Sequence, residues 1–343
     1  MDVLGIKKNY LIVSRGATAI YLILKGNKLE NKKVLLPANI CYAAVFPVVF
    51  SGNHPVFCDV DNKSGNVTYQ IVESMIKDVD IAILPHMFGN PIDEISEIKQ
   101  LCQNNNVLLI EDCASSMGSY DKNGVICGTS GDYTIFSTGY SKTVDVGGGG
   151  IIISDRDLQS LKDLYYLLPD KLVSHEYNES FFSKFYRLIR NNPHQTISSE
   201  ILVSSANVFR SLFIYKDLEI QSKVLQGLCQ LDDICQLRKK KCKLYDQLIP
   251  DNPLINKYHY SISAVPWRYN LFVRDDHHRK LIDYLLLHEI PVSDWYPNVT
   301  PVFGLKKYFE GVDHIEERII NFPLLIEDEK IMHIAETIKS YWG

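Results

Sequence analysis

The segment DYTIFSTGYSKTVDVGGGGIIIS, residues 132–154, contains one lysine, Lys142, between two apolar stretches that we expect to be strands. Ser137 and Ser141 bring hydroxyl groups close to this lysine in the sequence, and four consecutive glycines follow at 147–150. Glycine is favoured where the backbone needs a positive φ or where a Cβ has no room. We therefore predict that at least one of the four has a positive φ. Lys142 is either a surface lysine in a turn or an amine placed for chemistry.

Two phosphate-binding motifs are excluded for this segment. A P-loop requires glycine directly before the lysine, where this chain has Ser141. A dinucleotide-binding fingerprint joins a strand to a helix, whereas the glycines here precede the strand-like run GGIIIS.

Two other stretches supply groups that complement an amine. Asp112 ends the apolar run VLLIED, where a carboxylate serves either as a helix cap or as a functional group. Gly16, Ala17 and Thr18 open an expected helix, whose first N–H groups and positive dipole end suit an anion. Pyridoxal 5'-phosphate (PLP) needs this combination: a lysine for its aldehyde, a carboxylate for its pyridine nitrogen and a helix N-terminus for its phosphate.

The elements that must position these groups alternate between strand and helix up to about residue 154. The strands are continuous apolar runs, typical of a largely parallel sheet with both faces covered, and ligands bind beyond the carboxyl ends of such strands. Residues 155–215 are helical and rich in aromatic side chains. We predict a large α/β domain over 1–222, with 155–215 as a divergent helical segment, and a small α+β domain over 223–343.

Composition narrows the function classes. Hydrophobic residues make up 46% and charged residues 22% of the 343 residues, which is ordinary for a globular protein with a sizeable core. The net charge of -5 argues against a nucleic-acid partner, and the basic run RKKKCK at 238–243 is expected to be a solvated helix face. The sequence has neither a signal-peptide pattern nor a membrane-spanning apolar run, so we expect a cytoplasmic protein with reduced cysteines. Cys58, Cys113 and Cys127 are expected to be core residues, and no metal site is expected.

Seven motifs in register resemble the DegT/DnrJ/StrS family of PLP-dependent sugar aminotransferases. The resemblance covers about residues 10–154 and 225 to the end. It rests on GATAIYLIL, VLLPANICYAA, HPVFCDVD, LPHMFGNPID, IEDCASSMGS, GTSGDYTIFSTGYSK and GGGGIIIS, with IINFPLL in the C-terminal part. It implies the aspartate aminotransferase-like fold type I, with PLP and pyridoxamine phosphate in the cycle, and a homodimer with shared active sites.

The resemblance also assigns residues. Lys142 matches the lysine that forms a Schiff base with PLP and then acts as the general base, and Asp112 matches the partner of the pyridine nitrogen. Ser137, with the Ala17 backbone and the Thr18 hydroxyl, matches the phosphate ligands. Tyr42 lies beside the position that stacks on the ring, although Cys41 is the strict match. His86 ends a strand near the site and is expected either to touch the cofactor or substrate or to make a structural hydrogen bond.

Departures from the family pattern fall where the substrate is held. Ser115 stands where the family often has Gln or His, and we keep it among the cofactor-binding candidates. The glycine-asparagine stretch that reaches the neighbouring subunit's phosphate is missing, and Lys216 falls at the asparagine position. Tyr296 and Pro297 retain the usual Tyr-Pro pair without the histidine that follows it. Lys216 and Tyr296 are therefore substrate-site candidates.

The function implied is transfer of an amino group from an amino acid, probably glutamate, to a keto-sugar. That sugar is expected to be linked to a nucleotide and to feed surface polysaccharide biosynthesis. The alternatives within catalysis are a small phosphorylated ketone such as a triose phosphate as substrate, or PLP-dependent dehydration or decarboxylation. Some relatives that dehydrate sugars carry histidine in place of the lysine, which is retained here. A non-catalytic binding protein is the alternative from another class, and retention of Lys142, Asp112 and Ser137 argues against it.

Overall fold

The computed structural model describes residues 4–190, 206–305 and 307–342. Its strands are β1 (Asn9–Val13), β2 (Lys33–Pro37), β3 (His54–Cys58), β4 (Ile81–Pro85), β5 (Leu108–Asp112), β6 (Tyr133–Ser137), β7 (Gly150–Ser154), β8 (Ile255–Lys257), β9 (Tyr269–Val273) and β10 (Ile319–Phe322). Its α-helices are α1 (Gly16–Gly26), α2 (Tyr42–Phe50), α3 (Tyr69–Met75), α4 (Ile95–Asn104), α5 (Gln159–Leu167), α6 (His175–Arg190), α8 (Ala206–Phe213), α9 (Ile220–Leu228), α10 (Leu231–Leu248), α11 (Asp275–Leu287), α12 (Glu310–Glu316) and α13 (Asp328–Trp342).

The larger sheet has seven strands in the order β1-β7-β6-β5-β4-β2-β3. Neighbouring strands from β3 to β6 pair in parallel, and β7 runs antiparallel to both β6 and β1. The predicted mostly parallel mixed sheet is confirmed. Its strands are largely apolar because helices cover both faces: Ile152 belongs to the core that contains α1, while Ile151 and Ile153 pack with α9.

The carboxyl ends of β1, β4, β5 and β6 lie at one edge of this sheet, because the four strands run in the same direction. β7 begins at that edge, with Gly150 paired to Ser137 on one side and to Val13 on the other. Asp112, Ser137 and the start of α1 are therefore brought to the same edge by strand order alone.

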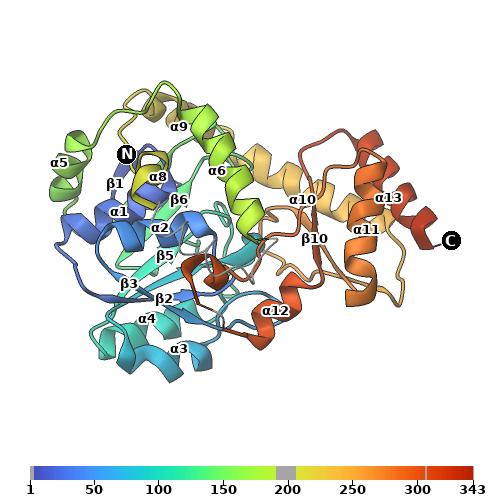
Figure 1. Ribbon diagram of the computed structural model, residues 1–343, viewed down its shortest axis with the longest axis horizontal. Coiled ribbons are helices and arrows are strands. Elements are labelled where there is room, and N and C mark those ends of the chain that lie inside the picture. The colour runs from blue at the N-terminus through green and yellow to red at the C-terminus, as the bar shows by residue number, and fades with distance from the viewer. Residues whose placement is uncertain (1–3, 191–205, 306, 343) are drawn as a thin grey trace.

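Helices α6 and α8 lie beside α2 (Figure 1). Their aromatic side chains cover α2. Phe46 of α2 stacks on Phe213 with 4.9 Å between the ring centroids, and Phe182 meets the same ring edge-on. The prediction that 155–215 is helical and aromatic-rich holds for its described part, and residues 191–205 lie outside the described residues.

The smaller sheet, in the order β10-β9-β8, is antiparallel and packs with α10, α11 and α13, which lie to the right of the large sheet in Figure 1. Its core holds Tyr245, Leu271 and Leu285. The predicted domain boundary at residue 222 falls inside α9, and α9 packs against the large sheet. The domain limits stay a prediction.

Helix α10 connects the two sheets and corrects one expectation. The basic run that begins at Arg238 is only partly a solvated face, because Arg238 and Lys241 are buried while Lys240 and Lys243 are exposed. The burial of Cys235, Arg238, Cys242 and Tyr245 follows helical spacing, so one face of α10 is interior. None of the helices in the described ranges is long and apolar enough to cross a membrane.

Candidate active site

The Lys142 side chain lies at the carboxyl edge of the large sheet, in the loop after β6. Its Nζ donates a hydrogen bond to Ser115 Oγ at 3.2 Å, and the phenol of Tyr296 is close enough to raise the pKa of the amine. Cys41 and Asp112 are close enough to interact with the amine electrostatically. The structure thus brings together four predicted residues: Lys142, Ser115, Asp112, and Tyr296 from the chain between α11 and α12.

Electrostatics distinguish the amine from the carboxylate. Burial lowers the pKa of Lys142, but its interactions with Tyr296, Cys41 and Asp112 together outweigh burial, so the pKa lies above its ordinary value. Burial raises the pKa of Asp112, and the Ala114 amide and Lys142 offset only part of that rise. A buried carboxylate with a raised pKa gains from a cationic N–H partner.

Asp112 has the geometry to accept such a partner. It is the last residue of β5 and only 6% exposed. The backbone N–H of Ala114 donates to Oδ1 at 2.9 Å, and no described residue donates a hydrogen bond to Oδ2. The second oxygen is therefore available to a protonated ring nitrogen.

The start of α1 and the end of β6 form a candidate phosphate site. A Cβ added to Gly16 would lie 3.5 Å from Ser137 Cβ, and one added to Gly139 would lie 3.5 Å from Ser137 Oγ. The Gly139 N–H points to Ser137 Oγ at 3.4 Å. The first N–H groups of a helix have no partners within it, so those of Gly16 and Ala17 can bind an anion beside the Ser137 hydroxyl.

The glycine run explains how these two backbones come so close. Gly147 and Gly149 have φ of 77° and 98°, which confirms the predicted positive φ. A Cβ on Gly150 would lie 2.5 Å from the Arg15 carbonyl carbon, and one on Gly149 would lie 2.1 Å from Thr138 Oγ1. The absence of side chains lets β7 begin directly against the residue that precedes α1.

Thr18 differs from its prediction. Its side chain is buried, and its hydroxyl donates to the Phe213 carbonyl at 2.8 Å. The Thr18 hydroxyl also accepts a hydrogen bond from Ser14 Oγ at 2.9 Å. The predicted phosphate contact of this hydroxyl is not supported, because the hydroxyl holds α1 to the end of α8. The Thr18 backbone N–H remains among the free donors of the first helical turn.

Tyr42 also differs from its prediction, because Cys41, the residue before it, is the one that faces Lys142. The Tyr42 ring lies against Tyr186 with a centroid separation of 4.2 Å and joins the aromatic cover of α6 and α8. Cys41 interacts electrostatically with both Lys142 and Asp112, and burial raises the pKa of its thiol. The residue facing the site is therefore the strict sequence match, a cysteine where a ring was expected.

His86 has a structural role for both ring nitrogens. Nδ1 accepts a hydrogen bond from the Ile92 N–H at 2.8 Å, so Nε2 carries the proton and donates to Glu111 Oε1 at 2.9 Å. This arrangement requires a neutral ring. Of the two roles expected for His86, the structural hydrogen bond is the one observed, and neither nitrogen faces substrate.

The atoms of His86, Glu111 and Cys113 lie within 4.8 Å of one another, a spacing that a metal could use. Four N–H donors already saturate the Glu111 carboxylate: His86 Nε2 and the backbone amides of Gly128, Ser130 and Gly131. The cluster therefore serves as a hydrogen-bonded anchor. The expected burial of Cys58, Cys113 and Cys127 is confirmed.

Lys216 is not brought to Lys142 within this chain. Its ammonium pairs with Asp170 at 3.3 Å and donates to the Tyr166 carbonyl, beside α5. The role predicted for it concerns a neighbouring subunit and stays a prediction.

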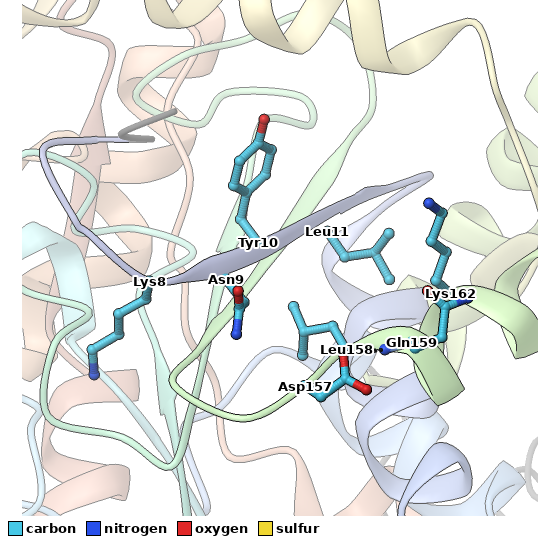
Figure 2. A pocket seen from close by; sticks show the side chains of 8 residues that line it. All are labelled: Lys8, Asn9, Tyr10, Leu11, Asp157, Leu158, Gln159 and Lys162. Carbon is cyan, nitrogen blue, oxygen red and sulfur yellow. Dashed lines mark hydrogen bonds between the residues drawn. The ribbon is translucent and has the colours of Figure 1, made fainter.

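A surface pocket of about 330 Å³ lies elsewhere, between β1 and the start of α5 (Figure 2). Its lining begins at Lys8 and Asn9, whereas the active-site edge lies beyond Val13 at the other end of β1. This pocket is separate from the Lys142 site.

Sequence reasoning missed three side chains that hold the Lys142 loop: Asp145, Arg238 and Trp267. Trp267 Nε1 donates to the Ser141 carbonyl, and Arg238 Nη2 donates to the Lys142 carbonyl, both at 2.8 Å. The helical spacing of buried residues along α10 was the one signal for Arg238. Trp267 carried no signal, because it is far from Lys142 in sequence.

The described residues fit PLP by the chemistry of their donors and acceptors. A lysine amine, a buried carboxylate oxygen without a donor, and a helix start beside a hydroxyl match its aldehyde, ring nitrogen and phosphate. The fit rests on these three features together, since each alone occurs widely.

Comparison with known proteins points to the same cofactor class. The sequence model of the DegT/DnrJ/EryC1/StrS aminotransferase family matches residues 2–339. A GDP-perosamine synthase of Escherichia coli O157:H7 is 24% identical over 96% of this chain and 85% of its own length. A GDP-4-keto-6-deoxy-D-mannose 3-dehydratase of Yersinia pseudotuberculosis is 25% identical over 73% of this chain and 62% of its own length. The crystal structure of the aminotransferase TlmJ from Streptoalloteichus hindustanus superposes with a TM-score of 0.75 at 17% identity, covering 98% of this chain and 87% of that one.

Proposed function

The chain belongs to the DegT/DnrJ/EryC1/StrS aminotransferase family, whose enzymes use PLP, and on that premise we propose that it transfers an amino group from glutamate to a nucleotide-linked keto-sugar. The product would serve surface polysaccharide biosynthesis. The observation that carries the proposal is the Lys142 amine, held 3.2 Å from Ser115 Oγ and within electrostatic reach of Asp112. The similarity to a GDP-perosamine synthase supports a nucleotide-sugar as the acceptor.

Each residue of the site has a role in this proposal. Bound PLP supplies an aldehyde for amine attachment and a ring that withdraws electrons from the carbon losing its proton. Lys142 holds the cofactor and, once released from it, moves the proton from the donor's α-carbon. The hydroxyls of Ser115 and Tyr296 orient the amine between these two tasks.

Asp112 and the α1 start bind the two ends of the cofactor. The Asp112 Oδ2 atom would accept the ring N–H. Because this carboxylate is buried, it would keep the ring nitrogen protonated more strongly than water does. Ser137 and the backbone N–H groups of Gly16, Ala17 and Thr18 bind the phosphate. Cys41 lies beside the amine, where the site would otherwise carry an aromatic side chain.

The assembly and compartment are part of the proposal. We expect a homodimer in which each active site uses residues of both subunits, and a cytoplasmic location. In such a dimer, Lys216 is the candidate for the neighbouring subunit's phosphate, which requires its pairing with Asp170 to open.

A small phosphorylated ketone is the second candidate acceptor. The aromatic side chains of α6 and α8 pack on Tyr42, which follows Cys41 in the chain. Trp295, the residue before Tyr296, stacks on Tyr186. Aromatic packing beside Cys41 favours a compact acceptor on that side of the site. A dehydratase is less favoured than an aminotransferase, because the chain retains Lys142 and a transferred amine needs that base.

The test is a two-stage reaction followed by absorbance. Protein loaded with PLP is mixed with glutamate, which should bleach the visible band of the lysine-bound cofactor and release 2-oxoglutarate. GDP- and dTDP-linked keto-sugars and a triose phosphate are then added separately, and the productive acceptor restores the band. Lys142→Ala should fail at the first stage, while the exposed-lysine control Lys162→Ala should match wild type. A band that glutamate does not bleach contradicts transamination, and restoration only by the triose phosphate overturns the nucleotide-sugar assignment.

A further inference from the structure

The backbone that carries Lys142 is held in a conformation that its sequence disfavours. Ser141, directly before the lysine, has φ of 60°, in the left-handed region that non-glycine residues seldom occupy. Such a residue persists where surrounding contacts over-determine it, and such residues cluster at functional sites. The contacts that hold Ser141 are therefore candidates for functional importance.

Side chains from three separate segments make those contacts. Asp145 Oδ2 accepts the Ser141 N–H at 2.6 Å, within the same loop. Trp267 Nε1 donates to the Ser141 carbonyl, and Arg238 Nη2 donates to the Lys142 carbonyl, both at 2.8 Å. We call Asp145, Trp267 and Arg238 the lysine clamp.

Two members of the clamp are tied to each other and to the interior. Arg238 Nη1 donates to the Trp267 carbonyl at 2.7 Å, and both residues are only 4% exposed. The Trp267 backbone N–H donates to the Phe88 carbonyl at 2.9 Å, which fixes it to the loop after β4. The clamp is thus a rigid link between α10, the segment before β9 and the Lys142 turn.

The same tryptophan also acts on the far end of the lysine side chain. Its ring stacks on Tyr296 with 5.4 Å between the centroids and 28° between the planes. Tyr296 in turn is close enough to the Lys142 amine to interact with it electrostatically. Trp267 therefore fixes the backbone of the lysine through its indole N–H and the amine through the face of its ring.

We propose that Asp145, Trp267 and Arg238 are positioning residues that hold Ser141 in its left-handed conformation and so aim the Lys142 amine at the cofactor aldehyde. This inference rests on the proposed function only through the role of Lys142. Loss of a clamp hydrogen bond lets Ser141 relax to an ordinary conformation, which turns the lysine away. Displacement of a reacting group by about 1 Å can lower a rate by about 100-fold.

The test measures how fast protein freed of cofactor captures added PLP, followed by the visible band of the lysine-bound form. Trp267→Phe keeps a stacked ring and removes the indole N–H, and we expect capture to slow by at least about 10-fold. Trp342→Phe is the matched control, because the Trp342 Nε1 has no hydrogen-bond partner among the described residues. It should capture PLP at the wild-type rate.

A rescue distinguishes positioning from general packing. Glycine adopts positive φ without strain, so Ser141→Gly removes the need for the clamp. The double variant with Trp267→Phe and Ser141→Gly should regain most of the lost capture rate. If Trp267→Phe does not fold, Asp145→Ala replaces it, since Asp145 is exposed and its loss should slow capture in the same rescuable way.

The outcomes separate this inference from the proposed function. Wild-type capture by Trp267→Phe or Asp145→Ala, or a slow variant that Ser141→Gly does not restore, overturns the clamp. Capture needs neither glutamate nor a keto-sugar, so a protein with the predicted capture rates that fails to bleach with glutamate leaves the clamp standing and contradicts the aminotransferase proposal.

Discussion

Glu111 and Asp112 are consecutive carboxylates on β5, and they lie in opposite environments. Successive side chains on a strand point to opposite faces, so Glu111 enters the interior while Asp112 faces the Lys142 side. Glu111 accepts four N–H hydrogen bonds, from His86 and from the turn at 128–131, at 2.7 to 2.9 Å, and the Cys113 thiol also donates to Oε1 at 3.8 Å. Asp112 accepts one, from Ala114.

The difference in partners reverses the effect of burial. Burial raises the pKa of Glu111, but His86 and the backbone amides outweigh it, so the net shift is downward. The pKa of Asp112 stays raised by burial because its donors are fewer. A saturated carboxylate stabilises the fold, whereas a buried carboxylate with a spare oxygen is held ready for a ligand at a cost in stability.

Removing the Asp112 charge should affect chemistry and spare the fold. Asp112→Asn replaces the acceptor for the ring nitrogen with a neutral amide, and we expect the rate of bleaching by glutamate to fall about 1,000-fold. Its unfolding free energy should equal or exceed that of wild type, since a poorly solvated charge is lost. Stopped-flow absorbance and urea denaturation measure the two quantities.

A fall of less than about tenfold in that rate would remove Asp112 from the cofactor site. So would an Asp112→Asn protein that is markedly less stable while its remaining folded fraction turns over normally, because Asp112 would then resemble Glu111.

The reverse pattern is expected for Glu111. Glu111→Gln places an amide N–H₂ among four N–H donors, and breaking a buried charged network of this kind costs about 4 kcal/mol. Urea denaturation should show this loss, while bleaching per folded molecule stays within about threefold of wild type, because the Glu111 side chain points to the opposite face of the strand from Asp112. Equal stability of Glu111→Gln and wild type would show that the four hydrogen bonds are not a structural anchor.

The glycine run allows the same contrast between a crowded and an open position. Gly147 and Gly149 both have positive φ, but a Cβ at Gly147 meets open space and one at Gly149 meets Thr138 Oγ1 and Val224. We expect Gly147→Ala to lower the unfolding free energy by about 1 kcal/mol and Gly149→Ala by about 3 kcal/mol. Similar losses at both positions would mean that strain alone, and not the crowding of Gly149 by Thr138 and Val224, requires glycine.

The smallest expected effect is a difference in pH dependence. Because the folded pKa of Glu111 is depressed, its stabilising contribution is present above the unfolded pKa and is lost as pH falls through the folded pKa. The folded pKa of Asp112 is raised, so ionised Asp112 lowers stability at neutral pH, and Asp112→Asn should gain stability there and not in acid. Denaturation midpoints between pH 3 and 8, compared among wild type and the two variants, measure this, and parallel curves would contradict it.

The sequence predicted what depends on strand order and local motif. Lys142, Asp112, Ser137 and the start of α1 meet because parallel strands place their ends together, which alternating apolar segments already indicate. The close approach at Gly149 and Gly150 needed the structure, whereas a positive φ within the glycine run was predicted from the sequence.

What the sequence did not predict depends on side-chain direction and distant contacts. At the start of α2, a shift of one residue decides whether Cys41 or Tyr42 faces the lysine, and residue type favoured the wrong one. Thr18 faces α8 because of where α8 packs. Arg238 begins a basic run made mostly of lysines, and that composition predicted exposure for the whole run. Trp267 reaches Ser141 only through the tertiary fold.

The most direct test of the central claim is reduction of the PLP-loaded protein with borohydride, followed by peptide mass mapping. Reduction fixes the cofactor to the lysine that holds it. The account predicts one phosphopyridoxyl group per chain, on the peptide that contains Lys142, and none in Lys142→Ala. Label on another lysine, or a wild-type protein without label, would contradict the account.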